Sequence, residues 1–286
     1  MIKPVRVLQL EKLKSIIIVG VGGTGGYLLQ QLARLLYGLK EQGNSVPSVL
    51  LIDGDLVESK NLRRQYFLPQ DIGKNKASVL AERYSRAYGL DIGAYPHYLA
   101  EETDFRRIFE MNHYSSTQSV TDPYVWIGCV DNAATRKLIH ERLHQHFSNV
   151  VYIDSGNGSV TVPNDNEHVD RYQLAHHKNQ GWEGQVVVGV RINGEDRLPF
   201  PGEVFPDLLE AESPEDRLPS EIPCGEVVVS NPQRLMTNLM AATSILMYLH
   251  TLLLDGTILL HRTFFDARKG YIRSDSAIDN VLEVAL

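Results

Sequence analysis

The chain has 286 residues, of which 43% are hydrophobic and 22% charged, and its formal net charge is −7. The apolar content is enough for a core, which argues against disorder. The acidic balance argues against a general nucleic-acid binder, because phosphate contacts need an excess of Lys and Arg. We expect no membrane span and no signal peptide, because long apolar stretches are interrupted by polar residues and the N-terminus lacks an apolar core followed by small residues. With only Cys129 and Cys224, a disulfide framework is excluded and we expect a cytoplasmic protein.

The negative charge is concentrated in one proline-rich stretch. Residues 195–221 carry nine acidic and two basic side chains, so the net charge of this stretch is 2 − 9 = −7, the same as that of the whole chain. One interpretation is a solvated, flexible insertion. The other is a crossover element that covers a carboxylate channel or docks a basic partner.

In the first half, short apolar runs alternate with helical patterns. The runs predict parallel strands, because strands covered on both faces have continuous apolar sequence. The expected strands are 15–19, 47–53, 92–99, 124–130 and 150–154. The expected helices are 27–39, 74–88, 104–111 and one that runs to about residue 147. This alternation predicts an α/β fold, a Rossmann-like, doubly wound and mostly parallel sheet with its ligand site at the carboxyl ends of the strands.

The second half has a different pattern, which predicts a smaller mixed β/helix part. We expect a strand at 185–192 that pairs with 159–162. A long core helix at 232–254 and a closing strand pair within 257–272 follow. We expect one domain over 1–286, with a nucleotide-binding half at 13–155 and a second half at 156–286.

A glycine-rich turn follows the first strand and opens a helix, which is the context that a G-x-G-x-x-G nucleotide motif requires. Glycines let the backbone approach a phosphate, and a helix N-terminus offers N–H groups and partial positive charge. Asp53 ends the next strand, where an acid accepts hydrogen bonds from the adenosine ribose. These features alone fit NAD, FAD or ATP. The glycines of the motif are Gly20, Gly22, Gly23 and Gly25.

Polar residues further along favour a triphosphate over a dinucleotide. Arginine and lysine neutralise phosphate charge, and a carboxylate can hold Mg2+. A dehydrogenase has no need for so many charged and amide side chains close to the acid that binds the ribose. The residues are Asn61, Arg63, Arg64, Lys76, Asp131 and Arg136.

Taken together, the motifs resemble the ThiF/MoeB/HesA superfamily, which includes the ubiquitin-activating enzymes. The family pattern is G-x-G-G-x-G, an acid pair, N-L-x-R-Q, G-x-x-K and D-N, and all five occur here in order between residues 13 and 140. In this chain the acid pair is Asp53 and Asp55, and the other motifs supply Asn61, Arg64, Lys76, Asp131 and Asn132.

The resemblance implies a role for each of these residues. The glycines form the phosphate loop, Asp53 holds the ribose, and Asn132 lines the adenine or ribose side. Asn61 and Lys76 lie by the phosphates, while Arg64 stabilises the leaving pyrophosphate. Asp131 binds Mg2+, so the implied cofactors are ATP and Mg2+.

The resemblance also implies an activity, the adenylation of the C-terminal carboxylate of a ubiquitin-like or sulfur-carrier protein. The second half then binds the partner, and Cys224, in a loop before the long helix, accepts the acyl group as a thioester. A conjugating-enzyme-like protein is a further implied partner, and a homodimer stays open. The family's zinc site of two C-x-x-C pairs is absent, so we expect no structural zinc. The chain resembles stand-alone bacterial ThiF-type proteins, including those of plasmid-partition (PRTRC) cassettes.

Three other interpretations stay open. An NAD- or FAD-dependent oxidoreductase explains the glycines and Asp53, and a non-catalytic scaffold could retain a degenerate nucleotide site. The third is a zinc hydrolase, because residues 140–144 match the pattern H-E-x-x-H. In this pattern two histidines on one helix face, here His140 and His144, can bind zinc, and the glutamate, here Glu141, acts as general base.

Overall fold

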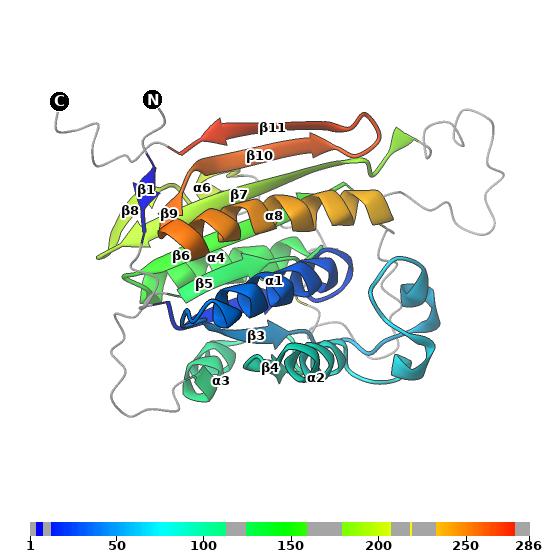
Figure 1. The fold of residues 1–286 in the computed structure, drawn as a ribbon. Coiled ribbons are helices and arrows are strands. Elements are labelled where there is room, and N and C mark those ends of the chain that lie inside the picture. Colours follow the sequence, from blue (N-terminus) through cyan, green and yellow to red (C-terminus); the bar gives the residue numbers. More distant parts are fainter. Residues whose placement is uncertain are drawn as a thin grey trace, which may run out of the picture.

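The computed structural model describes residues 4–7, 13–112, 124–158, 179–206, 218 and 233–277. One nine-stranded sheet runs through them in the order β11-β10-β7-β6-β5-β2-β3-β4, with β8 paired to β7 (Figure 1). The strands of this sheet are β2 (Ser15–Val19), β3 (Ser48–Ile52), β4 (Ile92–Tyr95), β5 (Tyr124–Gly128), β6 (Val150–Asn157), β7 (Glu183–Ile192), β8 (Glu195–Leu198), β10 (Leu260–Asp266) and β11 (Tyr271–Ser276). A separate two-stranded sheet pairs β1 (Val5–Arg6) with β9 (Thr257–Ile258).

The centre of the sheet is parallel, which confirms the predicted fold class. Strands β4, β3, β2, β5 and β6 pair in parallel, with Ile17 between Leu50 and Trp126. All five residues of β2 and of β5 are buried, as expected for strands covered on both faces. The carboxyl ends of these five strands therefore lie along one edge, where the predicted site residues follow them.

Helices cover both faces of the sheet (Figure 1). One hydrophobic cluster packs side chains of α1, α2 and α8 against the sheet, and a second cluster contains side chains of α3, α4 and the segment before α6. The helices are α1 (Gly23–Glu41), α2 (Lys76–Tyr88), α3 (Glu102–Asn112), α4 (Ala133–His146), α6 (Pro201–Val204) and α8 (Leu235–Asp255), with 3-10 turns η2 (Ser59–Arg63) and η3 (Pro69–Asp71).

The sheet continues from the first half of the chain into the second. Strand β7 pairs antiparallel with β6 and also with β10, which in turn pairs with β11. Most side chains of β11 are exposed, as befits an edge strand. The expected partner of β7, residues 159–162, lies outside the described residues.

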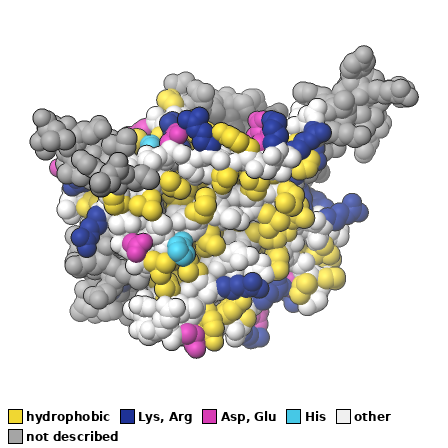
Figure 2. All heavy atoms as spheres, turned by 45° about the horizontal axis from the view of Figure 1, so that its top comes forward, with side chains coloured by type: hydrophobic (Ala, Val, Ile, Leu, Met, Phe, Trp, Pro, Cys, Tyr) yellow, Lys and Arg dark blue, Asp and Glu magenta, His cyan; other side chains and the backbone are white. Residues whose placement is uncertain are grey.

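Helix α8 is the one helix of the described part that is long and apolar enough to cross a membrane by length and composition. It packs against α1, β6 and β7, and 56% of its most apolar window is buried. On the face that Figure 2 shows, hydrophobic side chains lie among charged side chains, other side chains and backbone. We therefore describe α8 as the core helix that the sequence predicts.

Part of the acidic stretch belongs to the folded body. Its first residues form β8 and α6, and the Asp196 carboxylate accepts two hydrogen bonds from the Arg191 guanidinium, at 2.7 and 2.9 Å. Glu203 accepts a hydrogen bond from the Phe200 backbone N–H at the start of α6. The rest of the stretch, apart from residue 218, lies outside the described residues, so its proposed role stays a prediction.

Candidate functional site

The glycine-rich turn connects β2 to α1 at the carboxyl edge of the sheet. Gly20 has a φ of +83°, which favours glycine, and a β-carbon there would lie 2.7 Å from the Cys129 carbonyl oxygen. Gly22 is the N-cap of α1, so no side chain caps this helix, and its first turn contains no acidic residue. Helix α1 thus presents its first N–H groups and positive dipole end with no acidic residue in its own first turn, an arrangement suited to an anion.

Two side chains from distant parts of the sequence pack against this turn. A β-carbon at Gly23 would lie 2.0 Å from Asn238 Nδ2, and one at Gly22 would lie 3.3 Å from Gln65 Nε2. Asn238 is in the first turn of α8, and Gln65 ends the N-L-x-R-Q motif. The turn is therefore closely packed at these two glycines, and a side chain at Gly23 would displace Asn238.

Asp53, the predicted ribose acid, anchors the glycine turn in this structure. Its carboxylate accepts hydrogen bonds from the backbone N–H groups of Val21, at 2.8 Å, and Asp55, at 2.9 Å. Burial raises the pKa of Asp53 to about 6, while the positive charge of Lys76 acts in the opposite direction. Each carboxylate oxygen retains a second lone pair, so ribose hydroxyls can still donate to it.

Asp55 and Lys76 form an ion pair beside Asp53. The Lys76 ammonium lies 2.7 Å from Asp55 Oδ2, and the Tyr98 hydroxyl donates to Asp55 Oδ1. Burial acts to raise the pKa of Asp55, but the charge of Lys76 and the two hydrogen bonds outweigh it, so that pKa is lowered. Lys76, predicted to contact phosphate, is buried at the start of α2 with its charge matched by Asp55.

Asn61 and Arg64 lie in and after η2. Asn61 is buried, and its Oδ1 accepts a hydrogen bond from the Glu58 backbone N–H at 2.8 Å, which orients the amide and leaves its Nδ2 group as the donor for a phosphate. The Arg64 backbone N–H bonds to the Asn61 carbonyl. No hydrogen bond or ion pair joins the Arg64 guanidinium to another described residue. The phosphate roles of both residues stay predictions.

Asp131 and Asn132 follow β5, and the structure gives them different surroundings. Asp131 is exposed, and no bond joins its carboxylate to another described residue. Asn132 is the N-cap of α4, with its Oδ1 accepting from the Thr135 backbone N–H at 2.8 Å. The sequence signal for this cap is a polar residue just before a helix, a position at which the motif resemblance implies only a nucleotide contact.

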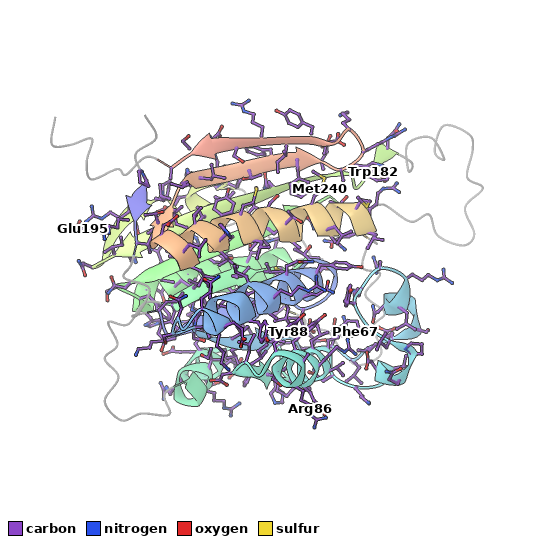
Figure 3. All side chains as sticks on the ribbon, in the orientation of Figure 1. Phe67, Arg86, Tyr88, Trp182, Glu195 and Met240 are labelled. Carbon is purple, nitrogen blue, oxygen red and sulfur yellow. The ribbon has the colours of Figure 1, made fainter. Side chains whose placement is uncertain are left out.

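A buried polar group that the sequence did not reveal joins the two halves of the chain beside the glycine turn. Asn157 Nδ2 donates to Thr24 Oγ1, at 2.8 Å, and to Asn238 Oδ1, at 3.1 Å. Asn238 is in the first turn of α8, and the Arg234 N-cap of that helix lies over Trp182, which is labelled in Figure 3. Thr24 Oγ1 also donates to Asn238 Oδ1 at 3.4 Å, and no local sequence signal could pair these residues, which are 214 positions apart.

The two cysteines differ in what the structure shows of them. Cys129 packs against the main hydrophobic cluster, and burial raises the pKa of its thiol, in keeping with a core residue rather than a nucleophile. Cys224, the predicted acyl acceptor, lies outside the described residues.

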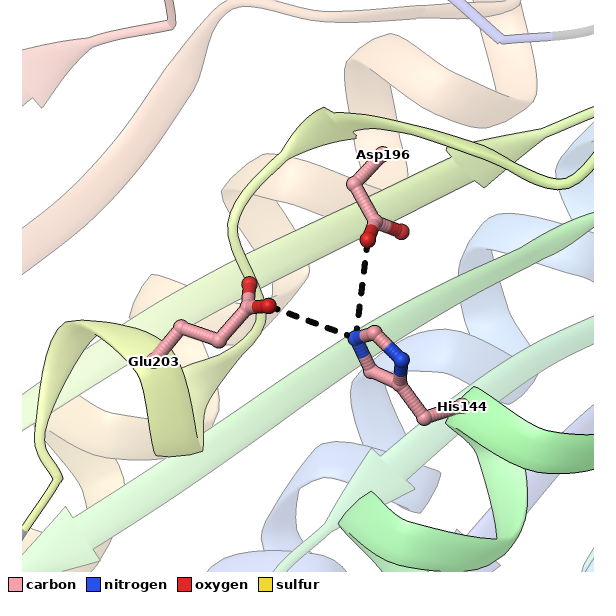
Figure 4. A group of neighbouring side chains, drawn as sticks. All are labelled: His144, Asp196 and Glu203. Carbon is pink, nitrogen blue, oxygen red and sulfur yellow. Dashed lines mark ion pairs between the residues drawn. The ribbon is translucent and has the colours of Figure 1, made fainter.

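The H-E-x-x-H pattern lies on α4, and Figure 4 shows His144 with Asp196 and Glu203. His144 Nε2 lies 3.5 Å from Asp196 and 3.4 Å from Glu203, so these three side chains have the spacing of a metal-ligand group. However, the Arg191 guanidinium, which lacks acceptors, lies 2.9 Å from His144 Nδ1, so this nitrogen must accept and Nε2 carries the proton. A metal on Nε2 needs the opposite tautomer. The Arg191 guanidinium supplies positive charge beside the Asp196 carboxylate. Glu141, the general base of the H-E-x-x-H pattern, is exposed and bonded to neither histidine.

A parallel sheet with a glycine turn, a helix N-terminus capped by glycine alone and an acid at the end of the next strand defines a Rossmann-like fold, in which ligands bind at the carboxyl ends of the strands. A family model described as the ThiF family matches residues 1–266. The chain therefore belongs to the ThiF family, which confirms the resemblance drawn from the motifs.

The relatives are longer than this chain. "Ubiquitin-like modifier-activating enzyme 5" of Drosophila willistoni is 26% identical over 144 residues, which is 50% of this chain and 33% of the relative. The crystal structure of selenomethionine PaaA has a TM-score of 0.55 at 16% identity, covering 94% of this chain and 66% of that one. E. coli MccB with ATP has a TM-score of 0.54 at 16% identity, covering 95% and 66%. These likenesses confirm the fold.

Proposed function

We propose that this chain binds ATP at the carboxyl edge of its parallel sheet and uses it to adenylate a carboxylate of a protein or peptide. The observation that carries the proposal is the glycine-capped N-terminus of α1, fixed in place by Asp53 through the Val21 N–H. Membership of the ThiF family supports it, as do the structures of MccB with ATP and of MccB with AMPCPP and the peptide MccA.

The proposed chemistry is a displacement at phosphorus. A carboxylate is a poor electrophile because it lacks a good leaving group. One of its oxygens attacks the α-phosphorus of ATP, the acyl–phosphate bond forms, and the bond to the β-phosphate oxygen breaks, with pyrophosphate taking the electron pair. No protein base is needed because the nucleophile is already an anion. The chain positions the reactants, and the N–H groups of α1 together with Arg64 offset the charge on the phosphates.

The residues present fit Mg2+, which prefers carboxylate oxygens and phosphates. Asp131 would hold the ion, because its carboxylate is exposed and is not paired with another described residue. The ion would neutralise phosphate charge when bound.

The finer proposal is that the substrate is the C-terminal carboxylate of a ubiquitin-like or sulfur-carrier protein. The relative that is named as a modifier-activating enzyme supports this choice over a free small acid. An NAD or FAD oxidoreductase would use the glycine turn and Asp53 but not Arg64 or Asp131. Titration with NAD, FAD and ATP distinguishes these interpretations, since we expect only ATP to bind tightly.

Adenylation predicts exchange of labelled pyrophosphate into ATP that depends on a carboxylate substrate. With a matching carrier protein we expect exchange, and with the same carrier amidated at its C-terminus we expect none. Asp131→Ala should lower the exchange rate at least about tenfold, because the phosphates lose a ligand of their metal ion. If the true carrier is present and no exchange occurs, adenylation is wrong.

A thioester on Cys224 is a separate, second step. Its thiolate would attack the acyl carbon, forming the C–S bond while AMP leaves. We expect a carrier adduct, labile to added thiol, in the wild-type chain and none in Cys224→Ala, with pyrophosphate exchange retained in both. Cys129→Ala serves as the control. An adduct that survives in Cys224→Ala would remove this residue from the mechanism.

A further inference from the structure

A buried ion pair lies beneath the turn that carries Asp131. The Arg136 Nε lies 3.3 Å from Asp154 Oδ2, and the two side chains are 13% and 7% exposed. Arg136 is in the first turns of α4, and Asp154 is on the neighbouring strand β6. The pair therefore links the helix that follows Asp131 to the interior of the sheet.

The same guanidinium also binds two backbone carbonyls. Its Nη2 donates to the carbonyl of Val130, the residue immediately before Asp131, and to the carbonyl of Ser155 at 3.0 Å. One side chain thus connects the turn after β5 to the carboxyl end of β6. On the other side of Asp131, Asn132 is held by its hydrogen bond with Thr135. Asp131 itself is exposed between two fixed neighbours.

Contacts on its other side hold Asp154 in place against Arg136. The Tyr152 hydroxyl donates to Asp154 Oδ1 at 3.1 Å, and a β-carbon at Gly128 would lie 2.5 Å from the same oxygen. Asp154 is 5% exposed, and burial raises its pKa while Arg136 counteracts this effect. The carboxylate is therefore a rigid anchor for the guanidinium.

Buried ion pairs contribute little net stability, because desolvation offsets the attraction between the charges. The position of this pair beside the Asp131 turn calls for another explanation. We propose that Arg136, anchored by Asp154, is a positioning residue that fixes the Val130–Asn132 turn and thereby orients the Asp131 carboxylate for the magnesium–nucleotide complex. This inference rests on the proposed function.

The first test needs no ligand. The backbone N–H groups of Cys129 and Thr135 are hydrogen-bonded on either side of the turn, so their hydrogen exchange reports its rigidity. In Arg136→Met we expect these amides to exchange at least about tenfold faster than in the wild type. Arg142→Met is the matched control on the same helix, since its ion pair is with Glu102, and it should leave both rates unchanged.

The second test measures AMPCPP binding by calorimetry at graded Mg2+ concentrations. Residues that orient a metal ligand typically change metal affinity by about 10–100-fold, so Arg136→Met should raise the Mg2+ concentration for half-maximal tightening about tenfold. Asp131→Ala should produce a similar rise. The double variant should need no higher Mg2+ concentration for half-maximal tightening than either single variant, because both changes act through the Asp131 carboxylate. Arg136→Lys, which keeps the charge, should recover part of the effect.

If Arg136→Met fails to fold, Arg136→Met/Asp154→Asn removes both charges and should show the same weakened Mg2+ dependence. Unchanged exchange rates, or effects of Arg136 and Asp131 that multiply, would overturn the positioning role while leaving ATP binding intact. Absence of AMPCPP binding by the wild type would instead overturn the proposed function, and this inference with it.

Discussion

Gly25→Ala is expected to abolish nucleotide binding, whereas Gly26→Ala, one residue later in the same helix, is expected to leave it intact. A β-carbon at Gly25 would lie 2.0 Å from the Gly20 carbonyl oxygen, a backbone atom of the phosphate turn. The turn must shift by more than an ångström to admit it, and misplacement on that scale costs roughly a hundredfold or more in function. We expect destabilisation of about 3 kcal/mol as well.

The control follows from the same geometry. The nearest atom to a β-carbon at Gly26 is the Val21 carbonyl oxygen at 3.5 Å, an ordinary contact. Alanine is also the better helix former by about 0.5–1 kcal/mol. AMPCPP titration with Mg2+ and thermal unfolding of both variants check the pair. Equal binding by the two variants would mean that the turn does not cradle the phosphates.

The strands could be predicted from sequence because burial on both faces leaves uninterrupted apolar runs, as in Ile16, Ile17 and Ile18. The ends of elements could not. Helix α1 starts at Gly23 although its periodic pattern starts at Tyr27, because the glycine turn winds directly into the helix. Strand β6 continues to Asn157, three residues beyond the apolar run, because those residues pair with β7.

The sequence motifs predict which residues belong to the site, but not which residues each of them contacts. Motif spacing placed Asp53, Asp55 and Lys76 after the second strand, and the structure brings them together. That Asp53 would hold the glycine turn, and Asp55 the lysine, depends on three-dimensional contacts. Asn238 joins the site from the other end of the chain, and only tertiary structure could reveal it.

Asp53 makes the stability of the nucleotide-free protein depend on pH in an unusual direction for an acid. Burial raises its pKa from 3.8 to about 6, so between these values the folded protein holds a proton that the unfolded chain has lost. Stability should therefore fall as pH rises through this range. Asp53→Asn removes this dependence. The difference in unfolding free energy between wild type and variant should change by an amount on the order of 2 kcal/mol from pH 4 to pH 7.

Nucleotide binding should reverse the shift, because ribose hydroxyls that donate to Asp53 stabilise its charged form. At pH 6 about half of the Asp53 carboxyls carry a proton, so we expect ATP binding to release up to about half a proton, measured by calorimetry in two buffers of different ionisation enthalpy. Wild-type affinity should fall roughly tenfold for each pH unit below 6. Asp53→Asn should bind about a hundredfold more weakly at pH 8, through loss of hydrogen bonds to a charged acceptor, and should lack the Asp53-linked proton release. That variant also reports any titration of the phosphates themselves. Equal proton release by wild type and variant would show that Asp53 does not contact the ribose and acts only through the backbone N–H groups of Val21 and Asp55.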